Sequence, residues 1–133
     1  MNYCLLKRFE NADSFLQEML TFGIPLEVSL VGAFDDTGRG SRRDIDLPLH
    51  RDGDYSPGFR GKIDIVGLYC IKPGIATTLV EYPGGRIESW VLEKNQAIIF
   101  DNKQCRHARY GPVGDRILLR VWISKKSSQK TLQ

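Results

Sequence analysis

Residues 77–92 read TTLVEYPGGRIESWVL, and this stretch decides the fold. Residues 77–82 and 86–92 are rich in β-branched and aromatic side chains, which favour strands. Between them, Pro83-Gly84-Gly85 is a turn sequence short enough to join two antiparallel neighbours. The stretch therefore predicts a β-hairpin in the second half of the chain.

Further strands are predicted on both sides of this hairpin. Short apolar or alternating runs are bounded by Gly, Pro and polar residues, at residues 26–34, 44–50, 63–71, 97–100 and 116–124. Pro48 interrupts one of these runs, which places that strand near a sheet edge because proline cannot donate to a ladder.

One helix is predicted at about residues 13–23. Ser14 can cap it, with Gln17 as a capping-box partner, and Gly23 and Pro25 stop it. A short helix followed by seven or eight strands indicates a mainly β fold, a double-stranded β-helix of the jelly-roll or cupin-like kind. The length of 133 residues suits a single domain, with a core at about 26–124 and a frayed tail at 125–133.

The composition narrows the class of protein. A hydrophobic content of 41% with 26% charged residues is typical of a soluble globular protein, and a net charge of +3 supports nucleic-acid binding only weakly. The cysteines Cys4, Cys70 and Cys105 show no C-x-x-C spacing, which favours a reduced setting. Neither a signal-peptide stretch nor an apolar run of roughly 20 residues is present. We therefore expect a cytoplasmic protein with no membrane partner.

The chain has only two histidines, and both fit a metal-site pattern. His50 and Asp52 form an H-x-D pair, and His107 follows the later strands. Residues i and i+2 of a strand point to the same side, so His50 and Asp52 can reach one ion. Two imidazoles and a carboxylate on one face of an octahedral ion leave its other positions open, as in non-haem Fe(II) oxygenases. We therefore predict that His50, Asp52 and His107 hold iron and form the catalytic centre.

Two arginines interrupt the apolar run at residues 116–124. Arg116 and Arg120 share one face of this predicted strand with Leu118 and Trp122. A guanidinium in an apolar strand needs an anion, and it binds a carboxylate in a bidentate way. The two arginines lie about 13 Å apart along a strand, so they cannot both hold one small carboxylate. One is expected to bind a cosubstrate, and the other a substrate or a structural ion-pair partner.

Three segments resemble the Fe(II)/2-oxoglutarate-dependent oxygenases. Residues 47–55, LPLHRDGDY, resemble the H-x-D segment of the taurine dioxygenase and gamma-butyrobetaine hydroxylase branch. Residues 100–109, with Phe100-Asp101-Asn102 before His107, are similar to that branch's distal-histidine segment. Residues 116–122 resemble the last core strand of prolyl hydroxylases. Members of the taurine branch are roughly twice as long, and their lid insertion is reduced here to residues 72–76.

The resemblance implies roles for individual residues. Arg116 would bind the distal carboxylate of 2-oxoglutarate, assisted by Tyr69 and by Thr78, with Thr77 as the register alternative. Arg120 falls where taurine dioxygenase binds the sulfonate of its substrate. The implied activity is hydroxylation or another oxidation, with release of succinate and CO2.

The substrate is expected to be a small molecule or a side chain, with an anionic one among the options. Tyr55, in the loop 53–61 after the H-x-D pair, is expected to close over it. The basic loop 39–43 gives weak support to a nucleic acid. A homo-oligomer in which one subunit supplies its neighbour's lid is a further option. Two alternatives stay open: a metal-binding cupin that does not use 2-oxoglutarate, and a non-catalytic ligand-binding barrel.

Overall fold

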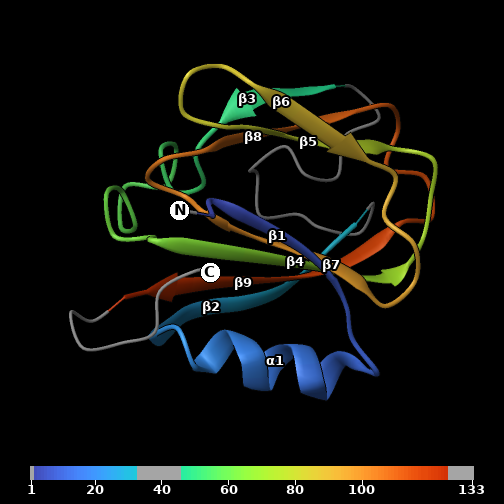
Figure 1. The fold of residues 1–133 in the computed structure, drawn as a ribbon, viewed down its shortest axis with the longest axis horizontal. Helices are drawn as coiled ribbons and strands as arrows, with labels where there is room; N and C mark the ends of the chain where they lie inside the picture. The colour runs from blue at the N-terminus through green and yellow to red at the C-terminus, as the bar shows by residue number, and fades with distance from the viewer. Residues whose placement is uncertain (1, 33–45, 126–133) are drawn as a thin grey trace.

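The fold consists of two antiparallel β-sheets in a computed structural model that describes residues 2–32 and 46–125 (Figure 1). The larger sheet has the strand order β1-β7-β4-β9-β2, and the smaller one β3-β8-β5-β6. The strands are β1 Cys4–Arg8, β2 Ile24–Val31, β3 Leu47–His50, β4 Ile65–Lys72, β5 Thr77–Glu81, β6 Ile87–Trp90, β7 Gln96–Asp101, β8 Arg106–Tyr110 and β9 Ile117–Ser124. The predicted mainly β, jelly-roll-like class with one short N-terminal helix is confirmed.

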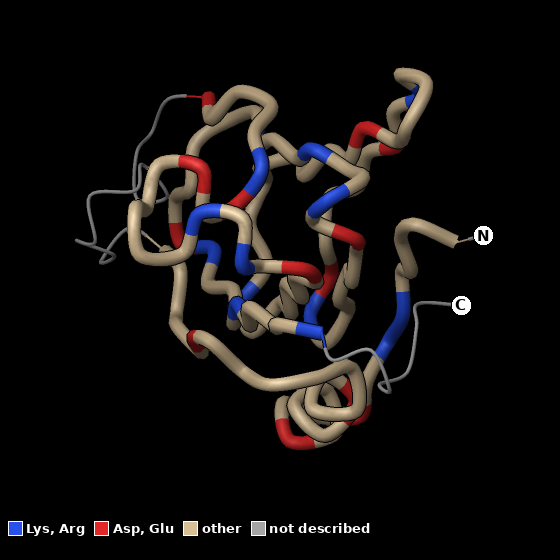
Figure 2. The backbone as a smooth tube through the Cα atoms, turned by 90° about the vertical axis from the view of Figure 1, so that its left-hand side faces the viewer, with Lys and Arg blue, Asp and Glu red and all other residues tan. Residues whose placement is uncertain are grey.

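Helix α1 (Ala12–Leu20) lies against the outer face of the larger sheet, and Figure 2 views it end-on below the rest of the fold. Its N-cap is Asn11, whose Oδ1 accepts the Ser14 N–H at 2.9 Å, while Ser14 Oγ accepts the Asn11 N–H at 3.2 Å. The prediction that Ser14 caps the helix was therefore wrong. Asn11 is an equally good cap and comes first, so Ser14 takes the N3 position of the capping box.

Helix α1 docks on β4 at a glycine. Phe15 and Met19 are fully buried and pack with Ile65 and Tyr69, which are the helix-facing residues of β4. A Cβ atom on Gly67 would lie 2.6 Å from Met19 Sδ and 2.8 Å from Phe15 Cζ. The missing side chain at Gly67 is therefore what allows the helix to approach the sheet this closely.

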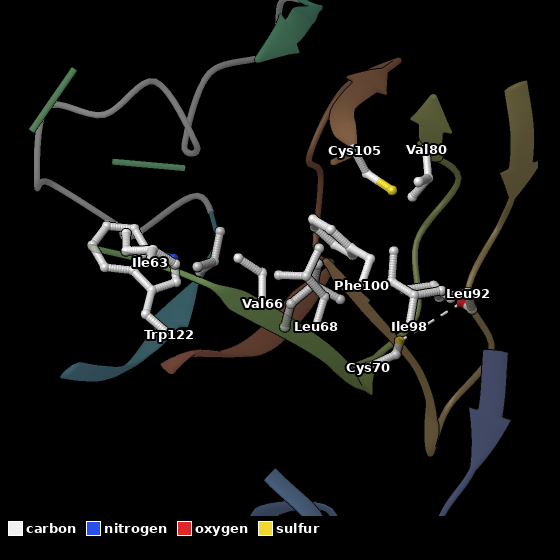
Figure 3. Packing of buried hydrophobic residues seen from close by; sticks show 12 residues of the cluster. Ile63, Val66, Leu68, Cys70, Val80, Leu92, Ile98, Phe100, Cys105 and Trp122 are labelled. Atoms are coloured by element: carbon white, nitrogen blue, oxygen red, sulfur yellow. Dashed lines mark hydrogen bonds between the residues drawn. The ribbon is translucent and has the colours of Figure 1, made fainter. Parts of the chain in front are cut away.

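A second apolar cluster fills the space between the two sheets (Figure 3). Val66 and Leu68 of β4 belong to it, together with Val80 of β5 and Trp122 of β9. Val66 and Leu68 alternate along β4 with the residues that face the helix, so β4 is buried on both faces. Leu68 and Trp122 also border a cavity whose other walls carry polar side chains from β3, β8 and β9.

Two strands were not predicted, β1 and β8. The strand β8 reads RHARY, and its buried side chains His107 and Arg109 are polar, so the alternating hydrophobic signal is absent. The predicted edge position near Pro48 is confirmed, because β3 has a single neighbour among the described strands. The ends of the predicted runs 26–34 and 44–50, the basic loop 39–43 and the tail from residue 126 on lie outside the described residues.

Within residues 2–32 and 46–125, no helix is long and apolar enough to cross a membrane.

Candidate metal centre

His50, Asp52 and His107 meet at one point between the two sheets, and we call them the metal triad. The β3–β8 ladder pairs His50 directly with His107. Asp52 Oδ1 lies 3.3 Å from the Nε2 atom of each imidazole, and the three ligating atoms all lie within 4.8 Å of one another. The structure thus brings together the three residues singled out in the sequence.

Asp52 does not reach the centre by strand alternation. Strand β3 ends at His50, and Asp52 lies in the following turn. Its main chain is held by Asn102, whose Oδ1 accepts the Asp52 N–H at 3.1 Å and whose Nδ2 donates to the Asp52 carbonyl at 2.9 Å. Asn102 Nδ2 also donates to the Ile63 carbonyl at 3.1 Å. This buried amide replaces the ladder contacts that the turn lacks.

The donor atoms of the metal triad fit a cation. His50 Nδ1 lies 2.8 Å from the Pro48 carbonyl oxygen, which only accepts, so the ring nitrogen donates. In the neutral ring Nε2 then carries a lone pair, and it points at the Asp52 carboxylate. Electron-rich atoms that converge in this way need a positive charge, either a proton on an imidazole or a cation between the ligands. A divalent metal ion would supply it and is matched by two nitrogen donors and one oxygen donor.

At Asp52 and His107 the local electrostatics favour the protonation states that metal ligands need. Burial alone would raise the pKa of Asp52, but the two imidazoles outweigh it and hold this pKa well below its usual value. Burial lowers the pKa of His107, which keeps this imidazole neutral. Burial also disfavours charge on His50, but Asp52 outweighs it and raises the His50 pKa. The centre therefore holds a carboxylate that attracts positive charge, and at least one neutral imidazole.

The metal triad opens into a cavity of about 80 Å³ that also contains Arg116 and Thr78. Arg116 is 5% exposed, and its Nη1 donates to Thr78 Oγ1 at 3.0 Å. Burial, helped by the nearby Arg109 charge, lowers the Arg116 pKa to about 10, so the guanidinium remains charged at neutral pH. Among the described residues no carboxylate lies within 4.0 Å of Arg116. This is a buried cation in need of an anion.

The cavity separates the two candidate threonines. Thr78 is buried and lines the cavity, whereas Thr77 is half-buried and does not line it. The register that places Thr78 beside Arg116 is therefore the one the fold adopts.

Arg120 also lines the cavity, and its charge helps to lower the pKa of Asp52. Its Nη2 lies 3.3 Å from Glu27 Oε2, and its guanidinium lies over the Trp122 ring at 4.7 Å from the centroid. Arg120 is thus both a cavity residue and one half of an ion pair. Tyr55 is 86% exposed and lines the cavity from the loop 53–61.

Tyr69 is placed elsewhere, which contradicts the role predicted for it. Its ring stacks on Phe15 at 5.2 Å under helix α1, and its hydroxyl donates to Asn95 Oδ1. Its neighbour Leu68 faces the cavity instead. Because β4 is buried on both faces, its sequence does not show which alternate set of side chains points toward the cavity.

Two residues of the centre were not identified as site residues from the sequence, Asn102 and Trp122. The Trp122 indole N–H donates to Asp52 Oδ2 at 2.8 Å. A signal for Trp122 exists in hindsight, because it lies two positions after Arg120 on one face of a strand. For Asn102 the signals are its place in the turn that leads to His107 and in the Phe100-Asp101-Asn102 segment.

The fold is similar to that of solved 2-oxoglutarate/Fe(II) oxygenases. A Pseudomonas putida prolyl-4-hydroxylase has a TM-score of 0.56 and 11% identity, over 93% of this chain and 73% of that one. An oxidoreductase of the 2OG-Fe(II) oxygenase family from Burkholderia pseudomallei has a TM-score of 0.50 and 13% identity, over 63% of this chain. The chain spans only 40% of the length of the Burkholderia protein. No family model and no curated protein matches the sequence. At these identities the likeness shows the fold and does not distinguish a branch.

Proposed function

We propose that the protein is a non-haem Fe(II)- and 2-oxoglutarate-dependent oxygenase. It would hydroxylate or otherwise oxidise a substrate, with release of succinate and CO2. The observation that best supports this is that one cavity contains both the metal triad and the buried Arg116. A cation site or an anion site alone is common to many proteins. Together they suit a ligand with a metal-chelating end and a carboxylate at its other end.

Each side chain has a separate task in this proposal. The metal triad would hold Fe(II) from one face, and Arg116 with Thr78 would bind the distal carboxylate of 2-oxoglutarate. Bound iron and 2-oxoglutarate supply the activation of dioxygen that oxidises a C–H bond. The apolar walls at Leu68 and Leu118 limit the access of water to the charged groups.

Arg116 and the metal triad argue against the cupin and the binding-barrel alternatives. A metal-binding cupin that does not use 2-oxoglutarate leaves the buried Arg116 without a purpose. A non-catalytic ligand-binding barrel leaves the convergence of two imidazoles on one carboxylate unexplained.

An anaerobic titration tests the proposal. Addition of 2-oxoglutarate to the Fe(II)-loaded protein should produce a visible charge-transfer absorption. Arg116→Gln should weaken 2-oxoglutarate binding by roughly tenfold to a hundredfold, since a charge-assisted hydrogen-bonding group is lost. Arg86→Gln is the matched control, because Arg86 is exposed on the β5–β6 hairpin, away from the cavity.

Two results would contradict the proposal. Metal binding without the absorption band would favour the cupin alternative. A protein that takes up no iron, with a metal content that His107→Ala leaves unchanged, would favour the binding barrel.

The substrate we propose is a small molecule or a side chain that enters beside Tyr55, with an anionic one among the options because Arg120 lines the cavity. Succinate release under air, measured across a panel of neutral and anionic candidates, would separate these classes. Stimulation by neutral candidates alone would exclude a recognition role for Arg120.

A further inference from the structure

We propose that Trp122 is a positioning residue that keeps Asp52 a one-oxygen metal ligand. In this role Trp122 would preserve the open coordination positions that the chemistry needs. The inference rests on the proposed function and deepens it.

The two carboxylate oxygens of Asp52 have different partners. Oδ1 faces both imidazoles at 3.3 Å, while Oδ2 accepts the Trp122 indole N–H at 2.8 Å. The Asp52 side chain is only 6% exposed, so solvent has little access to replace the indole. Rotation of the carboxylate would therefore cost a buried hydrogen bond to a charged group.

Trp122 is itself held in place from several sides. Phe59, from the loop after the H-x-D pair, meets its ring edge-on at 5.1 Å, and Arg120 lies over its ring at 4.7 Å. Glu27 in turn holds Arg120 at 3.3 Å. A cation over the ring polarises the indole and makes its N–H a better donor. The ring has few ways to move, so the direction of its N–H is fixed.

The number of coordination positions on the metal explains why Asp52 should bind through one oxygen only. An octahedral ion has six positions, and three one-atom ligands leave three of them open. A chelating keto acid takes two of these, which leaves one for dioxygen. If Asp52 bound through both oxygens, only two positions would remain, and 2-oxoglutarate would fill them. The Trp122 N–H occupies the second oxygen and prevents this.

The test counts water molecules on bound Mn(II), used in place of Fe(II), by water-proton relaxation without any turnover. We expect three exchangeable waters in the wild-type protein and one after addition of 2-oxoglutarate. Trp122→Phe keeps an aromatic ring but has no N–H, and we expect two waters and then none. Trp90→Phe is the matched control, because Trp90 lies on β6 outside the cavity, and it should behave like wild type.

A kinetic measurement gives an independent readout. With Fe(II), Trp122→Phe should lower kcat for succinate release by at least about tenfold, while KM for 2-oxoglutarate stays within about threefold. A purely structural defect would lower the fraction of active protein, and it would leave the water count of the folded fraction unchanged.

A second variant keeps the test decisive if Trp122→Phe does not fold. In a Trp90→Phe background, 3-benzothienylalanine at position 122 has nearly the shape of tryptophan, but its sulfur cannot donate. Three waters on Mn(II) in this variant would overturn the role of Trp122 and leave the proposed function standing. A wild-type protein that binds no Mn(II) would overturn both proposals.

Discussion

Asn102 holds Asp52 by its main chain: the Asn102 side-chain amide accepts the Asp52 N–H at 3.1 Å and donates to the Asp52 carbonyl at 2.9 Å. The pair lies 50 residues apart in the chain. The arrangement has the donor and acceptor pattern of a β-ladder, made by one side chain at the point where β3 has ended. Asn102 thus holds the Asp52 main chain in place without contacting the Asp52 carboxylate.

Loss of the two hydrogen bonds between Asn102 and the Asp52 main chain, the Asn102 clamp, should affect both stability and metal binding. Asn102→Ala leaves the buried polar atoms of Asp52 and Ile63 without their partner, so we expect the free energy of unfolding to fall by about 2–4 kcal/mol. Mn(II) affinity should fall by roughly 10–100-fold. Chemical denaturation and a Mn(II) titration measure the two effects. Gln104→Ala, an exposed position in the same turn, is the control, and equal effects in both variants would refute the clamp.

Thr78 should matter for 2-oxoglutarate and its neighbour Thr77 should not. Thr78→Val keeps the shape of the side chain but removes the hydroxyl that accepts from Arg116 at 3.0 Å. The guanidinium loses an orienting contact, so the Kd for 2-oxoglutarate should rise by about tenfold, which corresponds to about 1.4 kcal/mol. Isothermal titration of the metal-loaded protein measures this value. A larger effect from Thr77→Val would mean that the alternative register is the functional one.

The stability of the protein should fall in alkaline solution because its thiols resist ionisation. Burial raises the pKa of Cys4 to about 12 and that of Cys105 to about 11, from 9.0 for an ordinary thiol. Above about pH 9 the unfolded chain loses these protons while the folded protein keeps them, so the free energy of unfolding falls as pH rises. Each such group contributes up to about 1.4 kcal/mol per pH unit in this range.

Denaturation curves between pH 8 and 11 check this expectation. Cys4→Ala removes one of the thiols whose pKa is raised and should make the decline shallower than in wild type. Identical slopes for the two proteins would show that Cys4 ionises normally in the folded state.

A methyl group added at Gly67, on the strand beneath helix α1, should weaken the docking of the helix. Gly67→Ala would place a Cβ atom 2.6 Å from Met19 Sδ, so we expect a loss of about 1–3 kcal/mol in stability. Gly58→Ala is the control, because no atom lies within 4 Å of a Cβ there. Thermal unfolding compares the two variants. A Gly67→Ala protein as stable as the control would show that the helix can shift without cost.

The sequence contained enough information for most of the centre because burying charged or rare residues leaves a clear pattern. The chain has two histidines, one of them in H-x-D, and Arg116 lies directly before an otherwise apolar strand. Such groups are costly to bury without a partner, which makes them candidates for a site from the amino-acid pattern alone. The hairpin around Pro83-Gly84-Gly85 was predictable for a similar reason, since few backbone conformations suit that sequence.

The rest depended on tertiary contacts that no local pattern encodes. Tyr69 and Leu68 are both apolar neighbours on a strand buried on both faces, so parity could not be assigned. The strand β8 was missed because its inward residues serve the site rather than the core. Asp52 reaches the centre through Asn102 rather than through strand geometry, and a contact across 50 residues is invisible in a sequence window.

The hydrogen bond from Trp122 to Asp52 spans 70 residues, and Trp122 is near the end of the last strand. While the chain is being synthesised, Asp52 leaves the ribosome 70 residues before this tryptophan does. A metal ion met at that stage would find Asp52 without its indole partner, and the complete pocket would appear only after translation of β9. The fully ordered centre should therefore form only once β9 has joined the sheet.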